Sequence, residues 1–365
     1  MKASMRKCAY TTTVQTFDGA ELNLAVLTTP ESLDLHRIIK NAQNNGCDCM
    51  IMEASSMAEK MQRMYNMHFG FGAFLNISPD HISPFEHKDF EEYFSYKLQI
   101  LKRCKNVAVN TDDEYAPRVL GALSDEGIKI TTFSLNNTAA DIYVVSSEKQ
   151  NFKRHIIIHT PLYDIETELE LSGEYNVYNA LAATALAYMA GIDEQSIASG
   201  IQNTFVPGRM EKISLGDYTV IADYAHNKTS MNAALKAIHE DYPDKKIKVI
   251  FGCSGGKVPK RREDMAYEAA QGAVYAYITN DNPALDDPQA IAEEIKAFAD
   301  KFGLPNEIVL DREEAVKQAV RDMQSDEIVF IAGKGREQFQ KIGGKIVFYD
   351  GDDVLARKFL DEYKK

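Results

Sequence analysis

The chain contains no tryptophan, has five cysteines and lacks an excess of basic residues. The cysteines are odd in number and scattered, so they do not indicate a disulfide framework. Cys47 and Cys49 have no second pair to complete a zinc site, and we expect buried, reduced thiols. The net charge is -13, which excludes nonspecific binding of nucleic acid through a basic surface. A local loop can still hold phosphate in such an acidic chain.

Long apolar runs are also missing. No segment approaches the ~20 apolar residues of a transmembrane helix, and the N-terminal segment has no apolar core typical of a signal peptide. We therefore expect a cytoplasmic protein. The length of 365 residues predicts two or three domains, given roughly 100–200 residues per domain.

The second half of the chain alternates short β-branched apolar runs with segments of helix length. This alternation predicts a parallel, doubly wound sheet, with residues 345–350 as one more strand. The expected strands cover 217–225, 246–253, 273–281, 306–311 and 326–333, and the expected helices 229–242, 261–271, 288–302, 312–323 and 352–365.

The first half is α/β but less regular, and it contains a predicted run of antiparallel strands between residues 128 and 162. Pro207 and Gly208 mark a hinge, so we predict domains at 1–207 and 208–365. The expected strands are 47–55, 71–78, 106–111, 128–134, 140–148 and 152–162, and the expected helices 90–104, 113–123, 175–191 and 194–204.

Polar motifs follow four of the predicted strands in the second half. Ligands of doubly wound sheets bind outside the carboxyl ends of the strands. Four polar loops at one such edge therefore predict a binding site there. The loops are 223–227, 252–257, 281–283 and 333–337.

An ordered set of short motifs runs through nearly the whole chain. It comprises Glu53-Ala-Ser55-Ser56, Asn76-Ile-Ser-Pro-Asp80-His81, Tyr96-Lys97, Tyr175-Asn176-Val-Tyr-Asn179, Pro207-Gly-Arg209-Met-Glu211, Asp223-Tyr-Ala-His226, Asp281-Asn282-Pro283 and Gly333-Lys-Gly-Arg-Glu337. This set resembles the Mur ligases, in particular the UDP-N-acetylmuramoyl-tripeptide synthetases. The resemblance implies an α/β fold with a central domain, here an incomplete mixed sheet, followed by a Rossmann-like C-terminal domain.

The resemblance also implies an activity in peptidoglycan precursor synthesis, and so in cell shape and cell division. ATP, with Mg²⁺, phosphorylates the terminal carboxylate of UDP-N-acetylmuramoyl-L-alanyl-D-glutamate, and a free amino acid attacks the acyl phosphate. Two other functions stay open. One is another ligase of the superfamily, such as a folylpolyglutamate synthetase. The other is a non-catalytic module that binds the UDP-sugar-peptide or docks to a ligase.

Three residues match the metal ligands of the family. They are Glu53, His81 and Lys97, the last as a carbamate formed with carbon dioxide. Without the resemblance, Glu53 is a strand-end carboxylate, His81 a capped histidine and Lys97 a solvated lysine.

The family's contacts to the UDP-sugar-peptide match Thr28, Thr29, Ser55 and Arg63, where Arg63 suits a carboxylate or phosphate. Taken alone, Thr28 and Thr29 read as caps of the following helix. Met57 stands where the family usually has histidine.

The resemblance assigns ATP contacts to Asn176, Asn179, Arg209, Asp223 and His226. Asn176 and Asn179 alone would be helix caps. Arg209 would supply positive charge to the phosphates.

The pocket for the incoming amino acid matches Lys257, Asp281, Asn282, Gly333 and Glu337. Lys257 stands where the family often has arginine. Enzymes that add diaminopimelate usually carry another arginine after the proline of Asp-Asn-Pro, which suits a second carboxylate. Here that position is Ala284, which favours L-lysine over meso-diaminopimelate.

The Gly-rich phosphate loop of the family, ending Gly-Lys-Thr, is not found in the sequence. The glycine–lysine pairs at 256–257, 333–334 and 344–345 are not followed by serine or threonine. We expect that the chain starts downstream of this loop and of the family's uridine-binding domain, and that alone it binds ATP poorly and catalyses little. A fragment, a partner chain that supplies the loop, and a non-catalytic binder all fit.

Overall fold

The computed structural model describes the chain except residues 1–3, 5, 84–85, 151–152, 257–259 and 365. It divides into two compact units. The first contains Met1–Glu170 and Tyr175–Thr204, and the second contains Leu171–Glu174 and Phe205–Lys365. The division falls close to the predicted boundary after residue 207, but a short piece before the helix at 175–191 also belongs to the second unit.

The first unit opens with a small sheet in the order β3-β2-β1-β4. Its strands are β1 (Cys8–Thr11), β2 (Gln15–Phe17), β3 (Leu22–Leu24) and β4 (Cys49–Met52). β1 and β4 are parallel, whereas the other neighbours are antiparallel. Sequence analysis predicted β4 but missed the other three strands, which are only three or four residues long.

A six-stranded sheet follows in the order β10-β9-β8-β7-β6-β5. β5 to β8 are parallel, and only β8, β9 and β10 form an antiparallel run. The predicted antiparallel run therefore began one strand too early, because β7 pairs in parallel with β8. β7 also runs parallel to β6, since α4 (Ala116–Ser124) returns the chain between them. The strands are β5 (Phe69–Phe74), β6 (Cys104–Asn110), β7 (Lys129–Ser134), β8 (Ile142–Gln150), β9 (Lys153–His159) and β10 (Asp164–Leu169).

β4 and β5 are end strands of their sheets, and each pairs with one neighbour only among the residues that the structure describes. Side chains of both strands nevertheless pack on one core cluster that includes Leu35 and Ile100. Apolar side chains stay exposed on the two strands, with Ile51 at 51% and Phe71 at 40%. The strands of the first unit thus form two separate sheets, and the end strands β4 and β5 of these sheets pack on the same core cluster.

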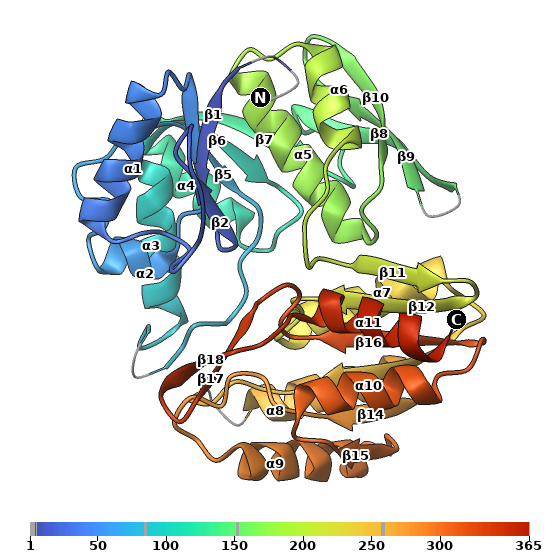
Figure 1. Cartoon of the computed structure of the whole chain (residues 1–365). Helices are drawn as coiled ribbons and strands as arrows, with labels where there is room; N and C mark the ends of the chain where they lie inside the picture. Colours follow the sequence, from blue (N-terminus) through green and yellow to red (C-terminus); the bar gives the residue numbers. More distant parts are fainter. Residues whose placement is uncertain (1–3, 5, 84–85, 151–152, 257–259, 365) are drawn as a thin grey trace. The chain divides into compact units, whose positions relative to one another are not determined.

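The helices of the first unit are α1 (Ser32–Asn44), α2 (Ser56–Lys60), α3 (Phe90–Lys102), α4, α5 (Glu174–Met189) and α6 (Glu194–Gln202). In Figure 1, α1 to α4 lie beside β1, β5 and β6, and α6 lies beside β10. α3 shows why such helices form here. Asp89 caps its first turn by accepting from the N–H of Glu92, and acidic residues at its start and Lys102 at its end suit the helix dipole.

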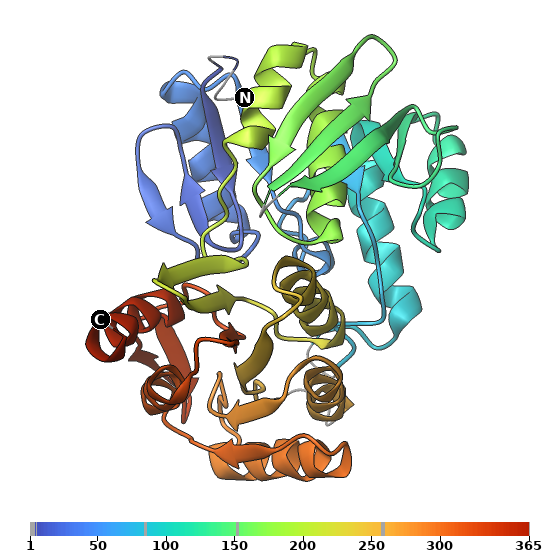
Figure 2. The same cartoon turned by 90° about the vertical axis from the view of Figure 1, so that its right-hand side faces the viewer.

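The second unit contains a six-stranded sheet in the order β11-β12-β16-β13-β14-β15. All neighbours are parallel except β11, so the predicted doubly wound sheet is confirmed, with one antiparallel edge strand added. Figure 2 shows this sheet between helices. The strands are β11 (Glu211–Leu215), β12 (Tyr218–Asp223), β13 (Lys246–Phe251), β14 (Tyr275–Ile278), β15 (Asn306–Ile308) and β16 (Glu327–Ala332).

Both faces of this sheet are covered by amphipathic helices. α7 (Lys228–Asp241), α8 (Lys260–Gly272) and α9 (Pro288–Lys301) contribute to one core cluster, and α10 (Arg312–Asp322) and α11 (Asp352–Tyr363) to the other. The predicted strand at 345–350 forms as β18 (Lys345–Phe348). It pairs with β17 (Phe339–Ile342) in a separate hairpin and not with the main sheet.

The helices that the structure describes include none with the length and apolar character needed to cross a membrane.

Candidate functional sites

A cavity of about 260 Å³ lies in the first unit beyond the ends of β4 and β5. It brings together several residues that sequence analysis selected for different roles. Glu86 also lines it and was not predicted. The lining residues are Leu27, Thr28, Ser55, Ser56, Met57, Arg63, His81, Glu86 and Lys97.

Glu53 follows β4 directly and is held by Thr13, a residue that sequence analysis missed. The backbone N–H and the hydroxyl of Thr13 both donate to Oε2 of Glu53, at 2.8 and 2.6 Å. The Thr13 hydroxyl is also 3.2 Å from that of Thr28, which lines the cavity. The only sequence signal for Thr13 is the threonine run at 11–13.

Lys97 lies on α3 and is not the solvated lysine of the alternative reading. Burial lowers the pKa of Lys97, and the nearby negative charge of Glu53 opposes that shift. Its ammonium lies 5.8 Å from the centre of the Tyr93 ring. A larger fraction of this amine is therefore neutral than in a solvated lysine, because burial disfavours the charged form.

His81 has a backbone φ of 58°, in the left-handed region. Its Nδ1 lies 3.1 Å from Oε1 of Glu86, and its ring lies 5.5 Å from that of Tyr93. Glu86 therefore engages Nδ1, which leaves Nε2 as the nitrogen suited to a metal.

Within the described part of the chain, no group of three or more His, Cys, Asp and Glu side chains could hold a metal ion. Glu53 and His81 offer two donors, and Lys97 as an amine offers none to magnesium, which prefers oxygen ligands and keeps several waters. The residues present therefore fit a partly hydrated Mg²⁺ only if Lys97 gains an oxygen ligand.

Thr29 is buried and does not line the cavity. Its hydroxyl donates to the carbonyl of Glu53 at 2.9 Å and accepts from the N–H of Ser55 at 3.0 Å. Helix α1 has Glu31 as its N-cap residue without a side-chain bond, so neither Thr28 nor Thr29 caps it. The prediction that these threonines cap the helix is wrong. The buried Thr29 hydroxyl instead fixes the backbone that follows β4.

Ser55 and Arg63 line the cavity but already have protein partners. Ser55 caps α2 by accepting from the N–H of Ala58. Arg63 pairs with Glu31 at 2.7 Å and donates to the carbonyl of Thr29 at 3.2 Å, while its buried Nε has no hydrogen-bond partner. Arg63 is thus held in place with one donor uncommitted.

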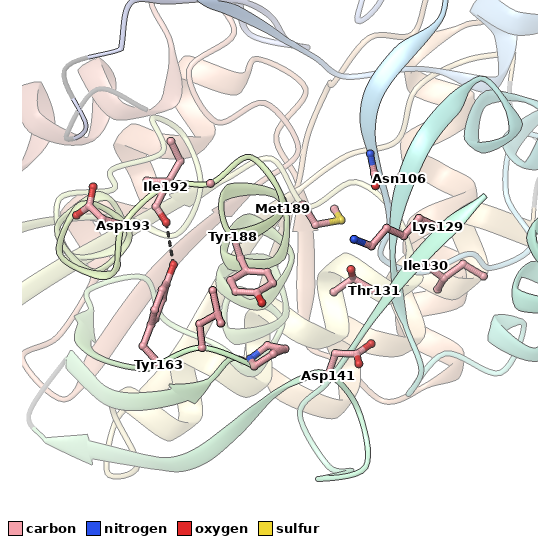
Figure 3. Close-up of a pocket in the computed structure, with 13 residues that line it drawn as sticks. Asn106, Lys129, Ile130, Thr131, Asp141, Tyr163, Tyr188, Met189, Ile192 and Asp193 are labelled. Atoms are coloured by element: carbon pink, nitrogen blue, oxygen red, sulfur yellow. Dashed lines mark hydrogen bonds between the residues drawn. The ribbon is translucent and has the colours of Figure 1, made fainter. Parts of the chain in front are cut away.

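A larger cavity of about 570 Å³ lies elsewhere in the first unit, at the amino ends of β6 and β7. Figure 3 shows the side chains of Lys129 and Tyr188 directed into it, while the Tyr163 hydroxyl donates to the carbonyl of Ile192 at 2.8 Å. None of its lining residues was predicted to bind or catalyse. The smaller cavity, at the opposite ends of the strands, is lined by the predicted metal ligands His81 and Lys97, whereas Glu53 is not among its lining residues.

Asn176 and Asn179 lie in α5 within the first unit. α5 begins at Glu174, so both asparagines are inside the helix and the capping reading is wrong. The side-chain amide of Asn179 donates to Oδ1 of Asn176 at 3.0 Å, and Asn176 is buried. Their assignment to ATP stays a prediction.

The polar loops of the second unit begin with Asp223 at the end of β12. Burial raises the pKa of Asp223, although its carboxylate accepts from the N–H groups of Met210 and Ala225, both at 2.7 Å. The N–H of Gly333 donates to the Asp223 carbonyl at 3.0 Å. Asp223 therefore joins the loop after β16 to the segment that contains Arg209.

Tyr224 links two further predicted residues. The guanidinium of Arg209 lies 4.5 Å from the centre of its ring, and its hydroxyl donates to Oε1 of Glu337 at 3.2 Å. Nδ1 of His226 lies 2.9 Å from the Tyr224 carbonyl. Burial and the charge of Glu337 raise the pKa of Tyr224, so the phenol stays protonated and donates.

Lys334 completes this group and was missed by sequence analysis. It is fully buried, and its ammonium donates to Glu337 at 2.7 Å and to Oδ1 of Asn282 at 3.2 Å. It also lies 3.6 Å from Oδ1 of Asp281. A buried lysine is rare unless it is paired, so Lys334 neutralises part of the charge of Asp281 and Glu337. Its position inside Gly333-Lys-Gly was the available signal.

Ala284 follows the Asp281-Asn282-Pro283 loop with a φ of 57°. Its N–H donates to the carbonyl of Lys341 at 2.8 Å, and its carbonyl accepts from Gly344 at 3.1 Å, so the β17–β18 hairpin fixes it. Gly333 has a φ of 121°, and a Cβ atom on it would lie 3.8 Å from the carboxylate of Asp281. Lys257 lies outside the described residues.

Comparison with known proteins gives two matches along the chain. Residues 1–187 match the Mur ligase middle domain, and residues 208–335 match the domain described as "Mur ligase, glutamate ligase domain". The chain belongs to the Mur ligase family.

Among curated relatives, this Mur ligase is 35% identical to the UDP-N-acetylmuramoyl-L-alanyl-D-glutamate--L-lysine ligase of Enterococcus faecalis, over 99% of this chain and 72% of that protein. It is 34% identical to a UDP-N-acetylmuramyl-tripeptide synthetase of Lactobacillus delbrueckii, over 93% of this chain and 69% of that one.

Solved structures agree with the fold. A UDP-N-acetylmuramoyl-L-alanyl-D-glutamate--2,6-diaminopimelate ligase matches with a TM-score of 0.66 and 27% identity, over 100% of this chain and 74% of that chain. Folylpolyglutamate synthase of Mycobacterium tuberculosis gives a TM-score of 0.69 at 15% identity, over 91% and 83%. At that identity the second likeness shows the fold alone.

Proposed function

We propose that this Mur ligase adds L-lysine to UDP-N-acetylmuramoyl-L-alanyl-D-glutamate in peptidoglycan precursor synthesis, with hydrolysis of ATP. The relatives that bear this activity in their names support the reaction. The observation that carries the choice of amino acid is Ala284, because a small apolar residue stands where an arginine would bind a second carboxylate. We propose the cytoplasm as the place of this reaction, because it uses ATP and a nucleotide-linked substrate.

In this proposal the residues around the 260 Å³ cavity hold the UDP-sugar-peptide. Arg63 keeps an uncommitted guanidinium donor for a carboxylate or phosphate. Thr28 and Ser55 supply hydroxyls at the same cavity. Thr29 acts indirectly, since its buried hydroxyl fixes the backbone between Glu53 and Ser55.

Glu53 and His81 would hold a Mg²⁺ ion, with Lys97 as the third ligand once carbamylated. The neutral Lys97 amine adds to carbon dioxide and loses a proton, which gives a carbamate with two oxygens. When bound, the metal neutralises charge on the transferring phosphoryl group. Thr13 keeps one Glu53 oxygen occupied, so the other oxygen would be the metal ligand.

The second unit would bring the amino acid and the positive charge for phosphate. Arg209, held over the Tyr224 ring, is the cation we assign to the phosphates, with Asp223, His226, Asn176 and Asn179 as further ATP contacts. Asp281, Asn282, Gly333 and Glu337 would receive the amino acid, with Lys257 for its α-carboxylate. The carboxylates of this pocket suit the side-chain ammonium of L-lysine.

We also propose that a further strand, from another segment or a partner chain, fills the open edges of β4 and β5 and contributes the phosphate loop. An unpaired, apolar strand edge is a template for another strand. Such a loop supplies backbone N–H groups and a lysine to the nucleotide phosphates. Alone, residues 1–365 should therefore turn over very little ATP.

The test compares residues 1–365 alone with the same chain completed by the part of the Enterococcus faecalis relative that it does not match. Mass spectrometry follows formation of the UDP-tripeptide from ATP, Mg²⁺, L-lysine and the UDP-dipeptide. We expect product only from the completed protein. A folded, completed protein that binds the UDP-dipeptide without making product would favour the non-catalytic binding module. Turnover with a folate and glutamate would favour the folylpolyglutamate alternative.

A further inference from the structure

Glu211 is a buried carboxylate that the proposed chemistry does not use. Its side chain is 3% exposed and accepts from Arg336 at 2.7 and 2.6 Å, in a two-pronged ion pair. It also accepts from Arg357 at 3.0 Å and from the N–H of Gly208 at 3.0 Å. All of these residues belong to the second unit.

The two loops that Glu211 joins also meet backbone to backbone. A Cβ atom on Gly208 would lie 2.6 Å from the nitrogen of Arg336, and one on Gly335 would lie 2.5 Å from the oxygen of Gly208. Both glycines have positive φ, 69° and 54°. Only glycine permits this approach without displacement of one loop.

Each loop carries a residue with a proposed role next to its contact point. Arg209 follows Gly208, and Glu337 follows Arg336. Tyr224 lies between them, with Arg209 over its ring and its hydroxyl on Glu337. Arg209, proposed to bind phosphate, and Glu337, proposed to bind the amino acid, are thus connected by two routes. One runs through Tyr224 and the other through Glu211.

We propose that Glu211 is a positioning residue that locks segment 206–211 to segment 333–337 as one rigid unit. L-lysine in the pocket at Glu337 then restrains the backbone around Arg209. This second statement rests on the proposed function, whereas the lock itself does not. A buried pair held only for stability could be replaced by apolar residues of similar volume. The two-pronged geometry adds a fixed orientation between the loops.

Hydrogen exchange of the whole chain, measured by mass spectrometry, tests the lock. Glu211→Gln keeps the shape of the side chain and removes its charge. We expect exchange to rise about tenfold or more in both 206–211 and 333–337, because hydrogen bonds to charged groups are lost. Glu313→Gln is the matched control, since it breaks the exposed Glu313–Lys358 pair at 2.7 Å in the same unit, and it should leave both segments unchanged.

Arg336→Lys is a second, milder variant that keeps the charge and loses the fork. It should loosen the same two segments together, by less, in a protein with native circular dichroism. An increase confined to one segment, or no increase in either variant, would overturn the lock.

Addition of L-lysine to the wild-type chain separates the two claims. In the wild type we expect L-lysine to slow exchange at 281–287, at 333–337 and at 206–211. In Glu211→Gln we expect L-lysine to slow exchange at 281–287 and 333–337 but no longer at 206–211. Protection of the pocket without protection of 206–211 in the wild type would contradict the coupling. No protection at 281–287 would count against the proposed amino-acid site. Exchange of the variants measured without L-lysine would still show whether Glu211 holds the two segments together.

Discussion

Thr13 donates two hydrogen bonds to the same oxygen of Glu53, one from its backbone N–H and one from its hydroxyl. The carboxylate is therefore fixed at the end of β4 with its second oxygen available. This contact therefore orients one of the three proposed metal ligands, and the charge of Glu53 also acts on a second, Lys97.

Replacement of Thr13 by valine should weaken divalent metal binding by about three- to tenfold, because one of the two donors that orient Glu53 is lost. Titration of the chain with Mn²⁺, followed by water proton relaxation, measures this affinity. Thr16→Val on β2 is the control, since its hydroxyl makes one weak contact among the described residues, to the carbonyl of Asn23 at 3.5 Å. Equal affinities in the two variants would contradict the role of Thr13.

Thr29 should prove to be a stability residue. Thr29→Val removes the acceptor of the Ser55 N–H and the donor to the Glu53 carbonyl in a buried place. Leaving such groups unsatisfied costs about 1–3 kcal/mol. Urea denaturation measures the loss, with Thr16→Val again as the exposed control. A free energy of unfolding equal to that of the wild type would show that these two hydrogen bonds of Thr29 do not stabilise the fold.

The pH dependence of the free energy of unfolding should reveal the contribution of the ionised Glu211 carboxylate. Burial of Glu211 raises its pKa, but the hydrogen bonds from Arg336 and Gly208 outweigh burial, and the net pKa is lowered from its ordinary value of 4.5. A depressed carboxyl pKa stabilises the fold above the unfolded-state pKa, and the contribution is lost as pH falls through the folded-state pKa. Glu211→Gln should therefore be less stable than the wild type near neutral pH, and the gap should narrow below about pH 4.5.

Urea midpoints between pH 3 and 7 measure that gap. Glu313→Gln should follow the wild-type profile at every pH. A constant gap between Glu211→Gln and the wild type across the range would mean that the ionised carboxylate is not what stabilises this region.

Ala284 should decide between the two diamino acids. Ala284→Arg should weaken L-lysine binding by about tenfold and improve binding of meso-diaminopimelate, because the guanidinium repels an ammonium and pairs with a carboxylate. Calorimetric titration of both ligands measures this. Ala284→Gly controls for the left-handed backbone, which glycine adopts readily. The glycine variant should keep the preference for L-lysine, and an arginine variant with the same preference would contradict the assignment.

The regular alternation of the second unit made its sheet predictable, because β-branched runs such as that of β16 are buried on both faces. The short strands β1 to β3 and the edge strand β11 were missed, since three to five residues carry little periodicity. β7 was found, but its pairing with β8 was predicted as antiparallel and is parallel, because alternation within a strand says nothing about its neighbours.

The same limit applies to the site. Motifs at strand ends, read through the family resemblance, selected Glu53, His81, Asn282 and Glu337, whose roles stay predictions. Partners from distant segments were out of reach, because neither the contact of Thr13 with Glu53 nor that of Glu211 with Arg336 has a local pattern. Lys334 illustrates the difference, since its motif was recognised while its burial among carboxylates depends on tertiary packing.

The most direct test of the ligase assignment is phosphate release by the completed protein with UDP-N-acetylmuramoyl-L-alanyl-D-glutamate, ATP and Mg²⁺, with L-lysine or meso-diaminopimelate as the amino acid. We predict release that requires the UDP-dipeptide and is faster with L-lysine. Faster release with meso-diaminopimelate would contradict the argument from Ala284. Absence of release with either amino acid, from a folded protein that carries a Gly-Lys-Thr loop, would contradict the proposed ligase activity itself.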